Sequence, residues 1–349
     1  MKLEKYIKVF DYLRKPINTM DRQNLNKIYP YYGAQGIVDY IDNYIFDGDF
    51  ILLAEDGNNL STLNENIATW ATGKFWVNNH AHVIQTNEFM DQRYLYYWLN
   101  FTNLSGYITG SAQPKLNKEN VLSIEINPPA IDHQQHIVNT IGSVDDLIEK
   151  NDEIICKIEE YLLIKLKSFK CENKTKLSCF FKCVNGGTFK SCDYIDFSLE
   201  KLITIKNIDQ SGFNVSNPTY FKMSNKYEKY RLEISDILLT MTGAYLGRCG
   251  IVDEDNCFQN QRILKVCCES KAFCYTCLKM YQNEIFQLGK GSAQPNLSLD
   301  DFYNYEINFK SSIIKEFKKF DALFDCILHY KIENKKLYKI KSFLLSKYF

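Results

Sequence analysis

An internal repeat constrains the fold of this 349-residue chain more than any other feature of its sequence. The heptapeptide Gly-Ser-Ala-Gln-Pro-Lys-Leu at 110–116 recurs at 291–297 with a single change, Lys115 to Asn296. At the same offset of 181 residues, Asn79 is matched by Asn260. This period is far longer than the roughly 20–50 residues typical of solenoid repeats, so we interpret it as a duplicated domain with its trailing helix.

The repeat divides the chain into four parts, and roughly 150 residues per domain agrees with two domains. We predict a first globular unit over 1–109, a helical spacer over 110–170, a second globular unit over 171–290 and a closing helical spacer over 291–349. The predicted fold class is mixed α/β, of the α+β kind, with two globular domains separated by an antiparallel pair of long helices. The repeat also predicts a pseudo-two-fold relation between the copies.

Both spacers carry apolar residues at alternating steps of three and four, which is typical of a coiled coil. Pro128-Pro129 predicts the start of the first helix, and Gly142 predicts an interruption. Ser143 and Asp146 then match a capping box that would restart the helix. The predicted seam consists of Val144, Ile148, Ile155, Ile158 and Leu162 in the first helix, and Leu323, Ile327, Tyr330, Leu337 and Leu344 in the second.

Polar and charged residues along these helices favour their pairing. Asn151 and Asn334 occupy seam positions, where a polar side chain can set the register at some cost in stability. Acidic residues dominate 145–160 and lysines dominate 331–347, so we expect ion pairs between the helices, each contributing about 0–1 kcal/mol. The alternative is two separate amphipathic helices, each packed on its own domain.

The length of the helices indicates what they could space. A helix of about 26 residues spans about 40 Å, and one turn of B-DNA is roughly 34–36 Å. An antiparallel pair would hold the two globular units at opposite ends, which suits two DNA half-sites read by one chain. Because the two units differ in sequence, we expect the half-sites to differ as well.

Both globular units contain side chains that can contact bases or phosphates. Amides can bind adenine edges, and Arg248 or Arg262 could bind guanine through two hydrogen bonds. The alternative for each residue is ordinary surface or turn chemistry. The predicted DNA contacts of the first unit are Tyr31, Tyr32, Gln35, Lys74, Asn78, Asn79 and His80. Those of the second unit are Lys206, Thr240, Thr242, Tyr245, Arg248, Asn260, Gln261 and Arg262.

Twelve cysteines raise the possibility of a zinc site. Cys179 and Cys183 are four residues apart, and Cys274 and Cys277 form a CxxC pair. The repeat places the CxxC pair within the counterpart of 93–99, a segment that resembles a buried helix, so apolar core positions are the favoured interpretation. We therefore predict no metal site, and we expect the thiols to be reduced.

The sequence lacks a convincing catalytic set, with no P-loop, G-x-S-x-G or H-E-x-x-H motif. In His80-Ala81-His82, strand spacing points the two rings to opposite faces, which disfavours a shared metal. Asn127-Pro128-Pro129-Ala130 is similar to the N-P-P-aromatic loop of adenine methyltransferases, but alanine replaces the stacking ring. A stand-alone DNA adenine methyltransferase is therefore a weak alternative.

Composition adds two limits. The formal net charge is zero, which argues against a basic tail coating nucleic acid but allows a local basic face. No run of about 18 apolar residues predicts a membrane span, and the charged start is unlike a secretory signal. We expect a cytoplasmic protein without membrane contact.

The order of these segments resembles the specificity (S) subunit of type I restriction–modification enzymes over nearly the whole chain. The resemblance rests on YYGAQGIVDYI at 31–41, IFDGDFILLAEDG at 45–57, KFWVNNHAHV at 74–83, the paired GSAQP-x-L motifs and both closing helices. The second copy departs from the first in lacking Pro128-Pro129 and much of the Gln134-Gln135 segment.

This resemblance implies two α/β target-recognition domains that read a bipartite DNA site. It also implies two methyltransferase subunits bound through the helical parts, with restriction subunits able to join that core. The chain itself would perform no chemistry and hold no cofactor, because S-adenosylmethionine would be used by the partner methyltransferase. The alternative is a coiled-coil adaptor that joins two proteins without touching DNA.

Overall fold

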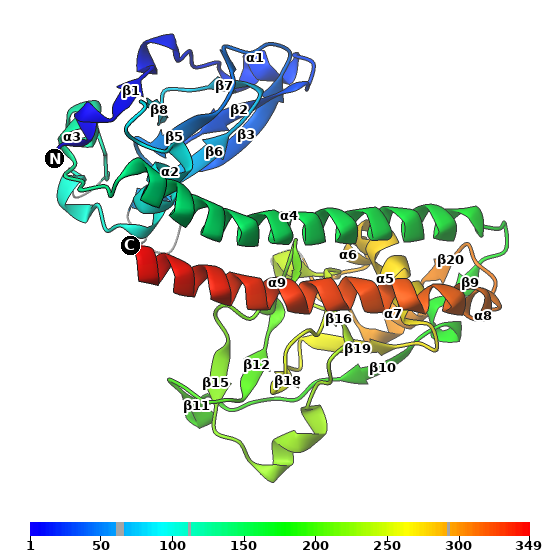
Figure 1. Cartoon of the computed structure of the whole chain (residues 1–349). Helices are drawn as coiled ribbons and strands as arrows, with labels where there is room; N and C mark the ends of the chain where they lie inside the picture. The colour runs from blue at the N-terminus through cyan, green and yellow to red at the C-terminus, as the bar shows by residue number, and fades with distance from the viewer. Residues whose placement is uncertain (61–65, 111–112, 292–293) are drawn as a thin grey trace. The chain divides into compact units, whose positions relative to one another are not determined.

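The computed structural model describes residues 1–60, 66–110, 113–291 and 294–349, which fold into two units (Figure 1). Unit 1 comprises Met1–Asp146 together with Tyr338–Phe349, and unit 2 comprises Leu147–Leu337. The mixed α/β fold class predicted from the sequence is confirmed in each unit. Within the described residues, no helix combines the length and apolarity needed to cross a membrane.

Unit 1 is built on two four-stranded sheets. The first is antiparallel throughout, and in the second the two central strands run parallel while the outer pairs are antiparallel. The first sheet has the order β1 (Ile7–Val9), β8 (Ala81–Thr86), β5 (Phe50–Ala54) and β6 (Ala68–Ala71). The second has the order β3 (Gly36–Ile41), β2 (Tyr29–Gly33), β7 (Lys74–Val77) and β4 (Phe46–Asp47).

The sequence of β5 explains how unit 1 is layered. All five of its residues are buried, and successive side chains of a strand point to opposite faces. Ile51 and Leu53 therefore join one apolar core, shared with the helix α2, while Phe50 and Leu52 join another core, shared with β7. The helices of unit 1 besides α4 and α9 are α1 (Thr19–Gln23), α2 (Gln92–Phe101) and α3 (Lys118–Ser123).

Unit 2 repeats the strand order of the first sheet of unit 1, whereas its second sheet keeps three equivalent strands and places the parallel pair at one edge. One antiparallel sheet has the order β10 (Lys182–Asn185), β19 (Ile263–Cys267), β16 (Ile237–Thr240) and β17 (Cys249–Ile251). The other has the order β11 (Tyr194–Ile195), β15 (Thr219–Phe221), β12 (Lys201–Ile203) and β18 (Cys257–Gln259), with β12 and β18 parallel. Two short pairs complete it, β13 (Ile208–Asp209) with β14 (Gly212–Phe213), and β9 (Thr175–Lys176) with β20 (Glu306–Ile307).

The helices of unit 2 cover the antiparallel sheet. On β16, Ile237 and Leu239 join the core that includes α5, while Leu238 joins a separate core, as on β5. Cys274 and Cys277 are buried in α5, which confirms their predicted place in the core. The shorter helices of unit 2 are α5 (Lys271–Met280), α6 (Gln282–Gln287), α7 (Leu299–Asn304) and α8 (Ile313–Phe317).

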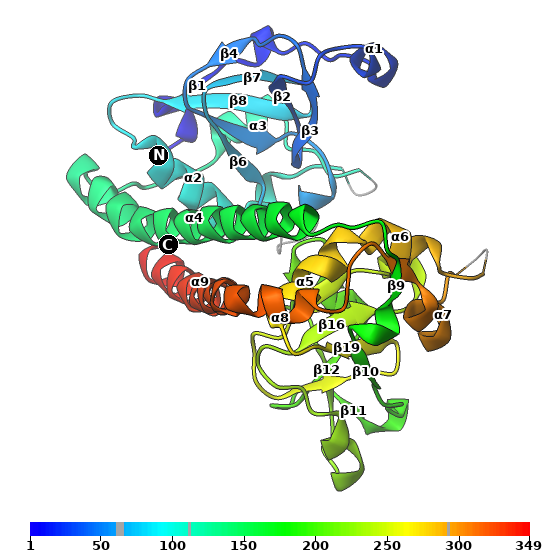
Figure 2. The same cartoon turned by 90° about the vertical axis from the view of Figure 1, so that its right-hand side faces the viewer.

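Two long helices, α4 (Ile131–Ser168) and α9 (Asp321–Tyr348), contribute to both units (Figures 1 and 2). The start of α4 after Pro128-Pro129 agrees with the sequence, but the predicted interruption at Gly142 is wrong. The helix continues through Gly142, and Ser143 Oγ donates to the Thr140 carbonyl oxygen at 2.9 Å instead of capping a new helix. Burial of Ile141 and Val144 on either side offsets the cost of about 1 kcal/mol for a helical glycine.

The predicted seam is present between the long helices within each unit. In unit 2, Asn151 Nδ2 donates to Asn334 Oδ1 at 2.9 Å and to Glu333 Oε2 at 2.9 Å. Asn334 Nδ2 donates in turn to Asp152 Oδ1 at 2.9 Å. Val144, Ile148, Ile155, Leu162 and Ile327 are buried, and Ile158, Leu323, Tyr330, Leu337 and Leu344 are partly buried.

One ion pair of the predicted kind joins the two helices, and other helix charges have partners elsewhere. Lys341 and Asp145, both in unit 1, form such a pair at 2.6 Å. In unit 2, however, Lys335 binds Asp253 of the loop after β17, and Glu159 binds Lys279 of α5. Lys335 and Glu159 therefore bind each of the two long helices to the globular part of unit 2.

Unit 1 is completed by a segment distant in sequence. The ring of Phe349 lies 5.3 Å from that of Tyr94 and 6.2 Å from that of Phe101, both on α2. Leu344 and Leu345 also pack against the core that contains α2. The end of α9 is thus part of the unit 1 core.

We expect Gly110→Ala to lower the free energy of unfolding by about 1–3 kcal/mol, as is typical of a residue forced into a sparsely populated backbone conformation. Gly110 has a φ of +89°, and an added Cβ would lie 2.4 Å from the Gln113 carbonyl oxygen. Urea unfolding would measure the loss. The control is Gly106→Ala, where a Cβ would meet nothing within 4 Å; equal effects of the two substitutions would contradict the prediction.

Candidate nucleic-acid interface

In unit 1, an asparagine turn follows β7. The Asn78 N–H donates to the Tyr32 carbonyl oxygen of β2 at 3.0 Å, and Asn78 Oδ1 accepts from the His80 N–H at 2.8 Å. Asn78 is buried, while Asn79 and His80 are exposed at the tip. The amide of Asn78 therefore holds a turn that presents its two neighbours to solvent.

Unit 2 has the same turn after β18. The Asn260 N–H donates to the Ile203 carbonyl oxygen of β12 at 3.1 Å, and Asn260 Oδ1 accepts from the Arg262 N–H at 3.1 Å. The structural counterpart of Asn260 is thus Asn78, one residue from the Asn79 suggested by the sequence offset. The sequence match is wrong by one residue, because the segment between the turn and the repeated heptapeptide is one residue shorter in unit 2 than in unit 1.

The repeated heptapeptide attaches beside this turn in unit 2; we call its segment the hairpin, because Lys290 and Asn296 form a pair of backbone hydrogen bonds across it. The Leu297 N–H donates to the Met241 carbonyl oxygen at 2.8 Å, and the Met241 N–H donates to the Arg262 carbonyl oxygen at 3.0 Å. These bonds join the hairpin, the end of β16 and the turn in series. Three segments that are distant in sequence, at Met241, Arg262 and Leu297, are thereby brought to one place.

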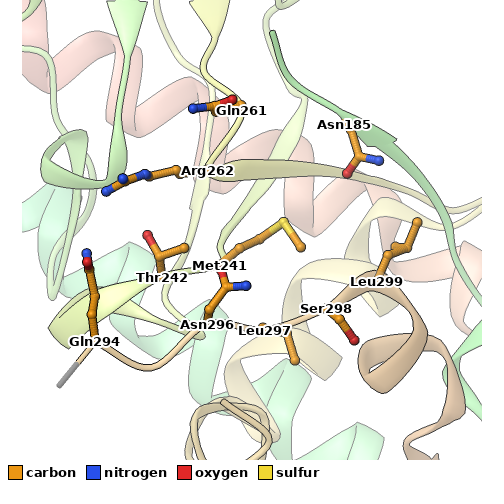
Figure 3. A pocket seen from close by; sticks show the side chains of 10 residues that line it. All are labelled: Asn185, Met241, Thr242, Gln261, Arg262, Gln294, Asn296, Leu297, Ser298 and Leu299. Atoms are coloured by element: carbon orange, nitrogen blue, oxygen red, sulfur yellow. The ribbon is translucent and has the colours of Figure 1, made fainter. Parts of the chain in front are cut away.

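A pocket of about 500 Å³ opens where these three segments meet (Figure 3). We call it the hairpin pocket. None of its ten lining residues is acidic, and most of its polar side chains are amides. The lining residues are Asn185, Met241, Thr242, Gln261, Arg262, Gln294, Asn296, Leu297, Ser298 and Leu299.

Two side chains of the hairpin pocket lack partners. Thr242 Oγ1 is buried and makes no hydrogen bond, and within the described part of the chain the exposed guanidinium of Arg262 makes no hydrogen bond or ion pair. Figure 3 shows both side chains at the same end of the pocket as Gln294. A buried polar group without a partner is costly, so this end of the pocket favours a polar ligand.

A second pocket of about 380 Å³ shares Gln261 and Arg262 with the first. It brings Lys206 and Asn260 to the same region, and it also lacks acidic residues. Five predicted contacts of unit 2 are therefore gathered around the turn after β18. They are Lys206, Thr242, Asn260, Gln261 and Arg262.

The corresponding region of unit 1 has different chemistry. Glu55 occupies the backbone position of Met241, since its N–H donates to the His80 carbonyl oxygen at 2.9 Å. Its carboxylate binds Lys115 at 3.1 Å and Arg14 at 2.8 Å. Burial opposes ionisation of Glu55, but the hydrogen bonds from Arg14 and Lys115 lower its pKa below the ordinary value.

The neighbouring carboxylate in unit 1 is also paired. Asp56 Oδ2 lies 2.7 Å from His80 Nδ1. A pocket of about 330 Å³ beside this pair is lined by Gln35, Asn78 and His80, which are three of the predicted contacts. The carboxylates of this region are thus paired with basic side chains, whereas the two pockets of unit 2 are lined by no acidic residue.

Three predicted contacts lie in the protein core and are corrected. Tyr31 is 1% exposed, and its hydroxyl accepts from the Ile17 N–H at 3.0 Å. Tyr32 is buried with its ring edge against Phe75. Thr240 is fully buried and donates to a backbone carbonyl of unit 2. Their burial keeps these side chains from contacting DNA in this structure.

Four other predicted contacts, Lys74, Asn79, Tyr245 and Arg248, line none of these pockets. Lys74 is exposed at the opposite end of β7, with its ammonium 4.6 Å from the centre of the Tyr44 ring. A hydrogen bond with Tyr44 raises the pKa of Lys74. Arg248 lies over the Tyr245 ring at 4.6 Å, so these two form a separate stacked pair.

Sequence reasoning missed Asn185, Gln294 and Asn296 as pocket residues. Gln294 and Asn296 belong to the repeated heptapeptide, which we used as a marker of duplication without assigning it a site. Asn185 ends β10, and the next residue, Gly186, lies so close to the turn that a Cβ would be 2.1 Å from the Asn260 carbonyl oxygen. For Gln294 and Asn296, the repeated heptapeptide was the sequence signal that could have identified the site.

The cysteines have surroundings unlike those of a zinc site. Burial raises the pKa of the Cys274 and Cys277 thiols well above the ordinary value, and it raises that of Cys183 to about 12. Among residues 1–60, 66–110, 113–291 and 294–349, no three His, Cys, Asp or Glu side chains are grouped so that they could hold a metal ion. His80 is exposed and His82 is buried, so their rings do face opposite sides.

Comparisons with known proteins agree with one another. Residues 8–160 match the type I restriction modification DNA specificity domain. A type I restriction enzyme specificity subunit of Haemophilus influenzae is 28% identical over 283 residues, covering 75% of this chain and 70% of that protein. The EcoprrI specificity subunit of Escherichia coli is 26% identical over 137 residues, covering 39% of this chain and 33% of that protein. The crystal structure of a type I restriction–modification S subunit from M. genitalium shares the fold, with a TM-score of 0.62 at 16% identity over 99% of this chain and 94% of that one.

Proposed function

From the match of residues 8–160 to the type I restriction modification DNA specificity domain, we propose that this chain is a specificity subunit whose two units read the two halves of an asymmetric DNA site. The observation that carries the proposal is the difference between two equivalent regions. Unit 2 presents Arg262 and amides in a pocket without acids, whereas unit 1 presents His80 beside paired carboxylates. Equivalent folds with different surface chemistry can bind different base sequences.

In this proposal the chain performs no chemistry itself. It binds double-stranded DNA and positions two methyltransferase subunits, with restriction subunits able to join the complex. S-adenosylmethionine is used by the methyltransferases, which act on a base taken out of the duplex. The exposed faces of α4 and α9 offer surface for those partners, since Leu147, Ile164 and Phe343 are exposed there.

A methylation map tests the proposal. The full chain would be co-expressed with its cognate methyltransferase, and methylated bases would be located across a genome. We expect one motif with two unlike specific halves separated by a gap of unspecified bases. The methyltransferase expressed alone is the control, and a contiguous motif or the absence of sequence preference would contradict the proposal.

Two simpler measurements separate the alternatives. A coiled-coil adaptor would leave the assembled complex without affinity for DNA, whereas we expect binding that weakens steeply as salt rises, because phosphate contacts release counterions. A stand-alone methyltransferase would transfer label from S-adenosylmethionine to DNA with the purified chain alone. We expect no transfer in that assay.

A further inference from the structure

The residues that distinguish the two half-sites must be residues that differ between the two units. The asparagine turn is shared, and so is the way in which the hairpin attaches to it. At the tip of the turn, however, Arg262 stands where unit 1 has His80. Beside it, Thr242 follows Met241 where Asp56 follows Glu55. The turn and the hairpin therefore form a framework common to both units, while these side chains can distinguish one base sequence from another.

The backbone of Arg262 is held at both of its polar groups. Its N–H donates to Asn260 Oδ1 at 3.1 Å, and its carbonyl oxygen accepts from the Met241 N–H at 3.0 Å. Its guanidinium, in contrast, is exposed and bound to no other described side chain. This arrangement suits recognition of a ligand by the guanidinium. Because the backbone is already fixed, binding costs conformational entropy of the side chain alone.

The chemistry of the hairpin pocket narrows the ligand. Arginine offers five N–H donors in a planar fork and no acceptor, so the ligand must present acceptors. Guanine presents two adjacent acceptors, O6 and N7, in the major groove. A phosphate also presents acceptors, but phosphates are the same in both half-sites and carry no sequence information. Since Arg262 belongs to the part that differs between units, the guanine edge is the better match.

We propose that Arg262 reads a guanine in the half-site recognised by unit 2. This inference rests on the proposed function and specifies one base within it. Thr242 and Gln294 lie at the same end of the pocket and supply further polar groups around that base pair. At the equivalent position of unit 1, His80 is hydrogen-bonded to Asp56. We therefore expect a different base preference at that position of the other half-site.

The test selects preferred sites from a randomised duplex library with the complete chain–methyltransferase complex. We expect the wild-type complex to require guanine at one position, and Arg262→Ala to accept all four bases there with the rest of the motif unchanged. The discrimination lost should be about 5- to 150-fold, the range expected for one bidentate arginine–guanine contact. Arg262→Lys, whose ammonium group cannot form the planar fork, should lose part of the preference for guanine. His80→Ala is the matched control, and it should leave this position unchanged.

Other outcomes overturn the inference. If Arg262→Ala weakens binding to all sequences equally and lowers the salt dependence by about one phosphate contact, then Arg262 binds the DNA backbone. If neither motif nor affinity changes, Arg262 does not touch DNA. A wild-type complex without any sequence preference would instead refute the proposed function. Because Arg262 is exposed, folding of each variant can be verified by its melting temperature.

Discussion

Replacing Lys335 by methionine is expected to lower the free energy of unfolding by about 2–4 kcal/mol near neutral pH. Lys335 Nζ lies 2.5 Å from Asp253 Oδ1, and the Asp253 side chain is 4% exposed. Removing one partner of a buried ion pair leaves an uncompensated charge, which typically costs about 3–5 kcal/mol. The partial exposure of Lys335 reduces this value. Urea unfolding of the full chain would measure the change.

The loss should depend on pH in a definite direction. Burial raises the pKa of Asp253 above its ordinary value, although the charge of Lys335 opposes this. A carboxyl with a raised pKa in the folded state favours folding below its unfolded pKa and disfavours it as pH rises through the folded value. Without Lys335 the pKa of Asp253 rises further, so the difference from wild type should be largest at neutral pH and small below about pH 3.9.

Two variants control this experiment. Lys336→Met removes an exposed neighbouring lysine and should change stability by less than about 0.5 kcal/mol. Combining Lys335→Met with Asp253→Asn removes both charges and should recover most of the loss. A loss that is independent of pH, or equal in Lys336→Met, would refute the role assigned to this pair.

Replacing Asn151 by leucine is expected to lower the free energy of unfolding by about 1–3 kcal/mol, because it leaves the buried Asn334 amide without one of its partners. Replacing both asparagines by leucine should restore stability or exceed that of wild type, since two apolar residues fit a coiled-coil seam. Asp152, which is exposed, can then bind water instead.

A double-mutant cycle measures this effect. We expect the two single losses to exceed the loss of the double variant by at least about 2 kcal/mol, which is within the range for residues in contact. Lys157→Leu on the exposed face of α4 serves as the control. Strictly additive losses would show that the two amides do not depend on each other.

The sequence was sufficient to predict the features set by periodicity. The repeat predicted two related units, which share the order of one antiparallel sheet, and the steps of three and four residues predicted the seam that contains Asn151 and Asn334. These predictions succeed because burial of one helix face imposes a spacing that is visible in the sequence. Gly142 was misjudged because packing on both sides of it outweighs the weak helix propensity of a single glycine.

The candidate site was only partly predictable. Gln261 and Arg262 were identified by their chemistry, but Tyr31 and Tyr32 were misplaced because their strand, β2, lies between two others and is covered. The match of Asn79 with Asn260 failed because segments of unequal length between the turn and the heptapeptide shift the offset between the copies. Only the hydrogen bonds of the turn reveal that Asn78 is the equivalent residue.

The two-part composition of unit 1 has a consequence for biosynthesis. Residues 338–349, whose Phe349 packs on Tyr94, leave the ribosome only after the whole of unit 2 has been translated. At roughly 5–20 residues per second, the body of unit 1 waits about 10–40 s for its final segment. During this interval the nascent chain exposes the apolar surface of α2 that Phe349 will cover, so a premature stop codon late in the message would damage the first domain synthesised and spare most of the second.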